Sequence, residues 1–155
     1  TTGVKIITIS DIRWKRRDIK STAMLGQAMG KQAAKLKGAY EAWMVEDGYV
    51  TEGTSSSAFI VDKNGIVRTQ PLGHHILPGV TRRSVLRLAD IEGVRVEERP
   101  FTVAEALSAR EAFMSAASAF VLPIVEIDGV KIGDGRPGQI AKLFRELYIE
   151  EAKKG

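Results

Sequence analysis

A short loop gathers one carboxylate, one glycine and a row of hydroxyl groups. It follows a predicted strand and reads Thr51-Glu52-Gly53-Thr54-Ser55-Ser56-Ser57. A carboxylate such as Glu52 accepts hydrogen bonds, and the hydroxyls both donate and accept them, so this loop can form a binding site. Taken alone, its spacing favours the simpler interpretation of a surface turn in which one serine caps the backbone.

A second segment with possible chemistry stands where a helix is predicted to begin. In Gly79-Val80-Thr81, the first backbone N–H groups of the helix would carry partial positive charge, and Thr81 would add a hydroxyl donor. A phosphate could dock there. Almost every helix needs such a start, so the segment alone does not establish an anion site.

Lys20 is one of 23 basic residues and follows the run Arg13-Trp14-Lys15-Arg16-Arg17. Most lysines are solvated surface charges, and nothing in its immediate neighbourhood singles Lys20 out. The basic run with an aromatic residue inside it also fits a nucleic-acid-binding module. Such runs more often form a solvated face or an interface.

Periodicity and turn residues predict the elements that position these segments. Helices are predicted over 23–37, from within 77–81 to about 90, over 103–109 and over 139–152. Strands are predicted over 4–8, 41–45, 49–51, 58–61, 66–69, 94–98 and 123–127. Ser21 or Thr22 should cap the first helix, and Gly38 should end it. Tight turns join several strand pairs, so an antiparallel or mixed sheet in an α+β fold is expected.

The composition is that of one globular domain, with 155 residues of which 44% are hydrophobic and 27% charged. The absence of cysteine excludes a disulfide scaffold, a thiolate zinc site and a cysteine nucleophile. No apolar run approaches the roughly 20 residues that cross a bilayer, and no secretory signal is visible, so we expect a soluble cytoplasmic protein. The net charge of +4 suits an anionic ligand, either nucleic acid or a small molecule with a phosphate.

Five segments, taken in order, resemble the class IV aminotransferases, which are the fold-type IV pyridoxal-phosphate enzymes. The resemblance is strongest to the D-amino-acid (D-alanine) aminotransferase branch and covers essentially the whole chain. The matching segments are 17–21, 38–42, 50–57, 76–82 and 113–138. The resemblance implies an open, barrel-like mixed sheet with surrounding helices, the large C-terminal domain of these enzymes.

The resemblance also implies pyridoxal 5'-phosphate as cofactor. Lys20 would hold the cofactor as a Schiff base and, once released, act as the catalytic base. Glu52 would face the pyridine nitrogen and keep it protonated, which lets the ring accept electrons. The other expected cofactor contacts are Ser55, Leu77, Val80, Thr81 and Ala117. By the same resemblance, a further phosphate contact maps onto the segment Ser115-Ala116-Ala117. Many relatives have Ser or Thr where this chain has Ala116 and Ala117, so a hydroxyl contact to the phosphate is lost and a backbone N–H remains.

The reaction implied by the resemblance is transfer of an amino group from an amino acid, such as D-alanine, to a 2-oxo acid. Within the same fold, a branched-chain aminotransferase and an aminodeoxychorismate lyase are alternatives. Outside enzymes, the alternative is the basic nucleic-acid-binding module, which rests on charge alone. Our interpretation has small-molecule substrates as partners and neither nucleic acid nor membrane.

The smaller N-terminal domain of the family is missing from this sequence, which begins at Thr1 rather than Met. That domain supplies an arginine to the phosphate and the groups that grip the substrate carboxylate. We therefore expect residues 1–155 to be the cofactor-binding domain of a longer, homodimeric enzyme, and to be inactive alone.

Overall fold

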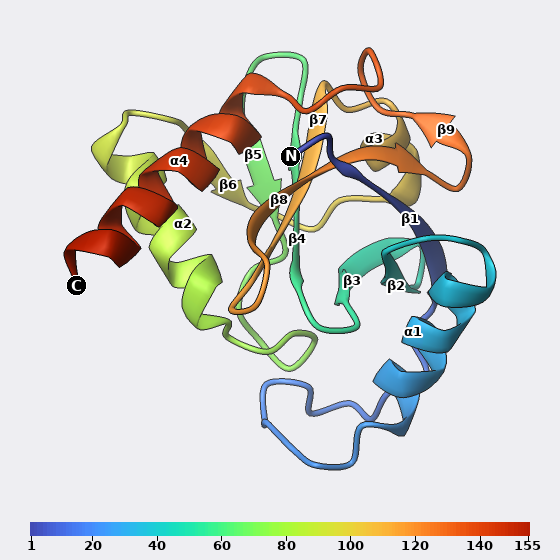
Figure 1. The fold of residues 1–155 in the computed structure, drawn as a ribbon. Helices are drawn as coiled ribbons and strands as arrows, with labels where there is room; N and C mark the ends of the chain where they lie inside the picture. The colour runs from blue at the N-terminus through green and yellow to red at the C-terminus, as the bar shows by residue number, and fades with distance from the viewer.

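A single mixed β-sheet organises the protein, which a computed structural model describes over residues 1–155 (Figure 1). The strand order is β3-β2-β1-β8-β7-β4-β5-β6, and β9 pairs with β8. The strands are β1 Val4–Ser10, β2 Glu41–Glu46, β3 Tyr49–Gly53, β4 Ser57–Val61, β5 Val67–Thr69, β6 Val96–Glu98, β7 Glu111–Ala116, β8 Phe120–Ile127 and β9 Val130–Lys131. The helices are α1 Leu25–Leu36, α2 Val80–Ile91, α3 Val103–Leu107 and α4 Gln139–Lys154.

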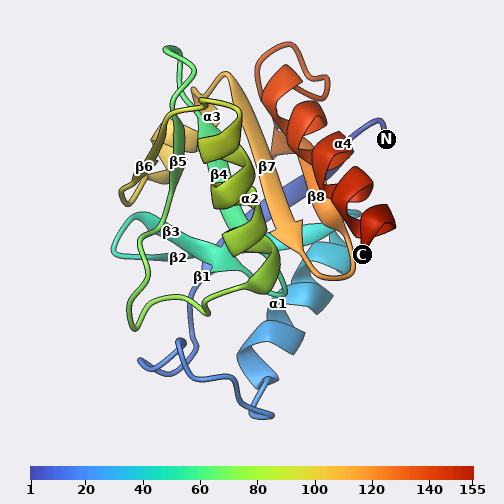
Figure 2. The same ribbon diagram turned by 90° about the vertical axis from the view of Figure 1, so that its left-hand side faces the viewer.

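The sheet is mixed, as expected. β1 runs parallel to both β2 and β8, and β5 runs parallel to β6, while the other pairs are antiparallel. The sheet also curls strongly (Figures 1 and 2), so that the segment after β6 reaches β3. There the Val50 N–H donates to the Phe101 carbonyl at 3.0 Å, and Tyr49 bridges to Thr102. The α+β prediction is therefore confirmed.

Two apolar clusters fill the two faces of the curled sheet. The concave side holds Trp43, Ile60, Phe101 and Met114, all essentially buried. The convex side packs against α2 and α4, where Phe59 stacks on Phe113 at 4.8 Å between ring centroids and Phe144 meets Phe113 edge-on. Alternation along β4 and β7 assigns successive side chains to opposite faces, and this decides which residues can reach the start of α2.

Most predicted elements are present with small changes of boundary. The hairpin turn has Asp47 at φ 53° and Gly48 at φ 82°, the positive angles that a two-residue turn requires. Gly38 (φ 69°) and Gly93 (φ 69°) follow α1 and α2 in the left-handed conformation. No helix combines the length and the hydrophobicity needed to cross a bilayer.

Two details of the sequence interpretation were wrong or incomplete. Neither Ser21 nor Thr22 caps α1, because Met24 is the N-cap and makes no side-chain hydrogen bond. The Ser21 hydroxyl instead accepts from the Ala23 N–H at 3.0 Å, in a turn that precedes the N-cap. Strand β7 was also missed: its small residues have weak strand preference, but the strand lies between β4 and β8 and pairs with both.

Candidate active site

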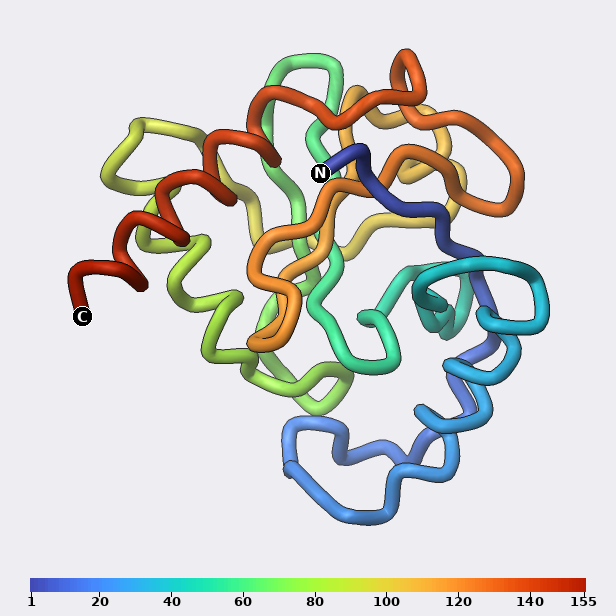
Figure 3. Tube along the Cα trace, in the orientation of Figure 1, coloured from blue at the N-terminus to red at the C-terminus, as the bar shows by residue number.

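Three connections meet at one edge of the sheet: the β3–β4 loop, the start of α2 and the β7–β8 turn (Figure 3). Ser57 of β4 pairs in register with Ser115 of β7, so the β3–β4 loop and the β7–β8 turn leave the sheet at the same end. A Cβ added to Gly79 would lie 3.2 Å from the Ser57 Oγ, which places the start of α2 against the same end of β4. The expected phosphate contacts Val80, Thr81 and Ala117 therefore share this edge.

Glu52 is the most unusual carboxylate of this edge. It is 6% exposed, and its Oε1 accepts from the Arg13 Nη1 at 2.7 Å and from the Leu77 N–H at 3.1 Å. Burial raises the pKa of Glu52 to about 6, although the Arg13 guanidinium acts in the opposite direction. Its second oxygen, Oε2, makes no hydrogen bond. Two predicted site residues, Glu52 and Leu77, are thus in direct contact, and one carboxylate oxygen is left free for a donor.

The start of α2 lacks a side-chain cap. Its N-cap is Gly79, which has no side chain to offer, and the first turn contains no acidic residue. Beside it, the Ser115 Oγ is buried and has no hydrogen-bond partner, and Ser57 lies across from it on the same face of the sheet. Uncapped N–H groups and a buried, unpaired hydroxyl form a donor set that fits a phosphate. Ala116 and Ala117 contribute no hydroxyl, so Ser115 carries the one hydroxyl of the segment 115–117, from which the sequence interpretation had selected only Ala117.

Lys20 lies in the segment 11–24, between β1 and α1, and makes no contact with Glu52. Its side chain is exposed and forms no hydrogen bond or ion pair. The segment itself is tied to the site edge, because the Arg17 N–H donates to the His74 carbonyl at 2.9 Å, just before Leu77. The ribbon shows this segment beside the loop that leads into α2 (Figure 2). Lys20 is thus near the edge through its segment, not through its own side chain.

The hydroxyl row of the β3–β4 loop is largely used by Glu41, a residue that the sequence interpretation did not select. Glu41 is 1% exposed and accepts hydrogen bonds from the Thr54 and Ser56 hydroxyls and from both the N–H and the hydroxyl of Ser55. This arrangement fixes the loop that carries Ser55. Glu41 opens the predicted strand 41–45, and nothing in the sequence indicated that the loop would fold back onto it.

The basic run that suggested nucleic-acid binding is neutralised within the fold. Arg13 pairs with Asp11 and Glu52, and Arg16 pairs with Asp18. Lys15 and Arg17 both pair with Glu46. In the basic run from Arg13 to Lys20, carboxylates therefore accompany every cation except Lys20.

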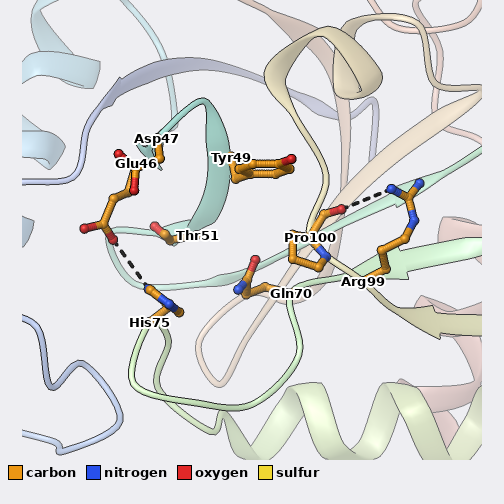
Figure 4. A pocket seen from close by; sticks show the side chains of 8 residues that line it. All are labelled: Glu46, Asp47, Tyr49, Thr51, Gln70, His75, Arg99 and Pro100. Carbon is orange, nitrogen blue, oxygen red and sulfur yellow. Dashed lines mark hydrogen bonds and ion pairs between the residues drawn. The ribbon is translucent and has the colours of Figure 1, made fainter.

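A separate cavity of about 380 Å³ lies beyond β3, and no predicted site residue lines it (Figure 4). Its walls are Glu46, Asp47, Tyr49, Thr51, Gln70, His75, Arg99 and Pro100. Two of these residues contact the charged groups next to Glu52. The Thr51 hydroxyl donates to Asp11, and Glu46 pairs with Arg17. This cavity therefore adjoins the charged groups behind Glu52 rather than the edge where α2 begins.

The sequence and the curled sheet both match a known protein family. The model of the family described as amino-transferase class IV matches residues 3–127, so the chain belongs to that family. It is 44% identical over 156 residues to the D-alanine aminotransferase of Bacillus licheniformis, covering 97% of this chain and 55% of that protein. It is 38% identical over 151 residues to the D-alanine aminotransferase of Staphylococcus aureus (strain N315), covering 96% and 53%.

Solved structures give the same family at the level of fold. The branched-chain aminotransferase of Thermoproteus uzoniensis with norvaline superposes with a TM-score of 0.87 at 32% identity, covering 96% of this chain and 51% of that one. The branched-chain amino acid aminotransferase of Thermobaculum terrenum in its PLP-form superposes with a TM-score of 0.86 at 30% identity, covering 96% and 50%. The expected fold-type IV architecture is confirmed. The chain spans about half the length of the curated relatives it matches.

Proposed function

We propose that this chain forms the pyridoxal-phosphate-binding part of an aminotransferase that moves an amino group from a D-amino acid, such as D-alanine, to a 2-oxo acid. The observation that carries the proposal is Glu52, a buried carboxylate with one oxygen held by Arg13 and Leu77 and the other free. The relatives named D-alanine aminotransferase support the substrate class, and the PLP-form of the Thermobaculum terrenum enzyme supports the cofactor.

In this proposal, one set of residues binds the ring of the cofactor and another set binds its phosphate. Pyridoxal phosphate, when bound, supplies an electron sink for the α-carbon of the amino acid. Glu52 accepts a hydrogen bond from the ring nitrogen, and Arg13 keeps Glu52 ionised. Lys20 would hold the cofactor through its amine and, once that amine is free, would act as the base for the proton of the α-carbon. Leu77 would contact the ring, and Ser55 would contact its pyridine side.

The phosphate end uses the edge where α2 begins. Val80 and Thr81 offer backbone N–H groups at the uncapped helix start, and Thr81 adds its hydroxyl. Ala117 offers a backbone N–H from the β7–β8 turn. Ser115 supplies a buried hydroxyl that lacks a partner, which offsets the hydroxyls that Ala116 and Ala117 do not provide.

A branched-chain substrate is the second candidate, because the solved neighbours are branched-chain aminotransferases. Aminodeoxychorismate lyase activity is a third possibility within the same fold. Rates with D-alanine and with L-leucine, each with 2-oxoglutarate, separate the first two, and pyruvate release without an amino acceptor identifies the lyase. The N-terminal domain, a homodimeric assembly, inactivity of this part alone and a cytoplasmic location stay predictions.

The testing experiment is to mix the purified chain with pyridoxal phosphate, follow the visible absorbance, reduce with borohydride and map the labelled peptide. Label on Lys20 is the expected result, and label on another lysine contradicts the assigned site. A polypeptide that adds the predicted N-terminal domain provides the activity test. If it transaminates no D-amino acid and no branched-chain L-amino acid, the proposed function is wrong.

A further inference from the structure

A line of alternating charges runs behind the proposed cofactor site. Arg13 contacts Glu52 at 2.7 Å and Asp11 at 2.8 Å. Arg17 then contacts Asp11 at 3.4 Å and Glu46 at 2.5 Å. The Asp11, Arg13 and Arg17 side chains are 0%, 5% and 1% exposed, so the middle of the line is buried. Only the Glu46 end reaches the surface, where it meets Lys15 and His75 beside the cavity (Figure 4).

Arg17 joins three parts of the fold at the centre of this line. Its Nη1 lies between Asp11, directly after β1, and Glu46, the last residue of β2. Its backbone N–H donates to the carbonyl of His74, in the loop before α2. The neighbouring Arg16 differs in each respect, because its side chain is 48% exposed and pairs only with Asp18. Arg17 therefore fixes the segment that ends, three residues later, in Lys20.

The charge balance of the line explains how Arg17 reaches Glu52. Three carboxylates, Asp11, Glu46 and Glu52, face two guanidinium groups, so Asp11 and Glu52 share Arg13. Arg17 supplies part of the positive charge that stabilises the Asp11 carboxylate, because it contacts the Oδ2 atom that Arg13 also contacts. Without Arg17, Asp11 would depend on Arg13 alone and draw it away from Glu52, while Glu46 would keep only its exposed partners Lys15 and His75. The weaker contact with Arg13 and the loss of one buried positive charge both oppose ionisation of Glu52.

We propose that Arg17 is a positioning residue of this site, which holds Arg13 against Glu52 and fixes the segment that presents Lys20. The inference rests on the proposed function for the role of Lys20 and Glu52, whereas the contacts of Arg17 do not. Arg17 itself touches neither cofactor nor substrate.

The test compares Arg17→Met and Arg17→Lys with the matched control Arg16→Met, which removes the exposed arginine of the same segment. The first readout is hydrogen exchange of residues 12–20 in the chain without cofactor. The second is a pH titration of the visible absorbance with added pyridoxal phosphate. In Arg17→Met we expect hydrogen exchange of residues 12–20 to be about tenfold faster. Cofactor binding should be about tenfold weaker, as when a residue that orients a ligand is removed. The spectral midpoint, which is the pH at half of the absorbance change, should shift to higher pH.

The lysine variant separates positioning from a general loss of structure. Arg17→Lys keeps the charge and should recover part of the spectral midpoint, although one ammonium cannot replace the planar guanidinium between two carboxylates. Arg16→Met should match the wild-type chain in both readouts. Unchanged exchange and an unchanged midpoint in Arg17→Met would overturn the proposal, as would an equal effect of Arg16→Met.

A milder variant covers the case in which Arg17→Met does not fold. Glu46→Gln removes only the charge of the surface partner of Arg17, so exchange of residues 12–20 should become faster by a smaller amount. Unchanged exchange in Glu46→Gln would also overturn the proposal. If neither the wild-type chain nor the longer polypeptide takes up cofactor, the proposed function fails, while the exchange data still decide whether Arg17 fixes the segment.

Discussion

The same two strands, β4 and β7, build a dry core at one point and a polar edge two residues away. Phe59 and Phe113 are fully buried and stack on each other beneath α2 and α4. Ser57 and Ser115 occupy the next positions on the same face, and the Ser115 Oγ has no partner. Nearby, Glu52 is buried with one oxygen unpaired. The difference teaches that the core stabilises the fold by itself, whereas the edge holds polar groups that a ligand would satisfy.

The largest expected effect comes from breaking the aromatic core. Phe113→Ala should lower the free energy of unfolding by about 3–5 kcal/mol, because it removes buried apolar contacts and leaves a cavity. Urea denaturation of the chain measures this loss. Phe120→Ala, which truncates a partly exposed ring, should cost clearly less, and equal losses would mean that the stacked pair is not the centre of the core.

The second effect concerns the edge and should leave the core intact. Glu52→Gln should lower kcat of the longer polypeptide by about a hundredfold, the scale of losing one preorganised electrostatic contact. Rate measurements with D-alanine and a 2-oxo acid give the result. Glu126→Gln, which alters an exposed ion pair with Lys5, is the control and should retain full activity. Retention of activity in Glu52→Gln would remove the assigned role of Glu52.

The third effect is a pH dependence of stability without cofactor. Because the pKa of Glu52 is raised from 4.5 to about 6, the folded chain binds more protons than the unfolded chain between these values. Stability should therefore fall as pH rises through this window, by up to about 2 kcal/mol. Urea titrations at several pH values test this, and Glu52→Gln should abolish the slope. Glu46 behaves oppositely, since the hydrogen bonds from Arg17 and Lys15 lower its pKa to about 2, and its contribution is lost only as pH falls from 4.5 toward 2.

The smallest expected effect tests whether Ser115 contacts the phosphate of the cofactor rather than its ring. Ser115→Ala should weaken binding of pyridoxal phosphate about fivefold, the scale of one hydrogen bond, and leave binding of pyridoxal unchanged. Ser108→Ala, at the end of α3, is the control. Equal weakening of both ligands would indicate a general disturbance of the edge rather than a contact to phosphate.

Much of the fold could be predicted because local signals agreed with the final structure. Asp47-Gly48 predicted the β2–β3 hairpin, and Gly38 and Gly93 predicted where two helices end. Strand β7 could not be predicted from its own residues, since it is stabilised by pairing with β4 and β8. The residues of β7 do not themselves indicate these partners. The parallel pair of β1 with β8 was likewise invisible, because nothing local specifies a partner more than one hundred residues away.

Some residues of the candidate site could likewise be predicted from the sequence, and others could not. Glu52, Leu77, Val80 and Thr81 were proposed from segments that resemble a family, and the fold gathers their segments at one edge. Arg13 and Arg17 looked like part of a solvated basic run, because charge type in a sequence does not reveal burial or pairing. Glu41 gave no signal, since the role of a lone carboxylate depends on what the fold places beside it. The resemblance pointed to the segment of Ser115, but only the fold shows that its hydroxyl is buried and has no partner.

The central place of β1 has a consequence for how the chain comes to fold. β1 precedes every other strand of this sheet in the sequence, yet one of its two neighbours, β8, ends at Ile127. The Thr8–Asp128 hydrogen bonds span 120 positions of sequence. Such long loop closures slow folding, and during synthesis on a ribosome one side of β1 stays without its partner until β8 has emerged. β1 therefore stays half-paired until residues up to β8 have been made, and its open side can meanwhile pair with a wrong strand.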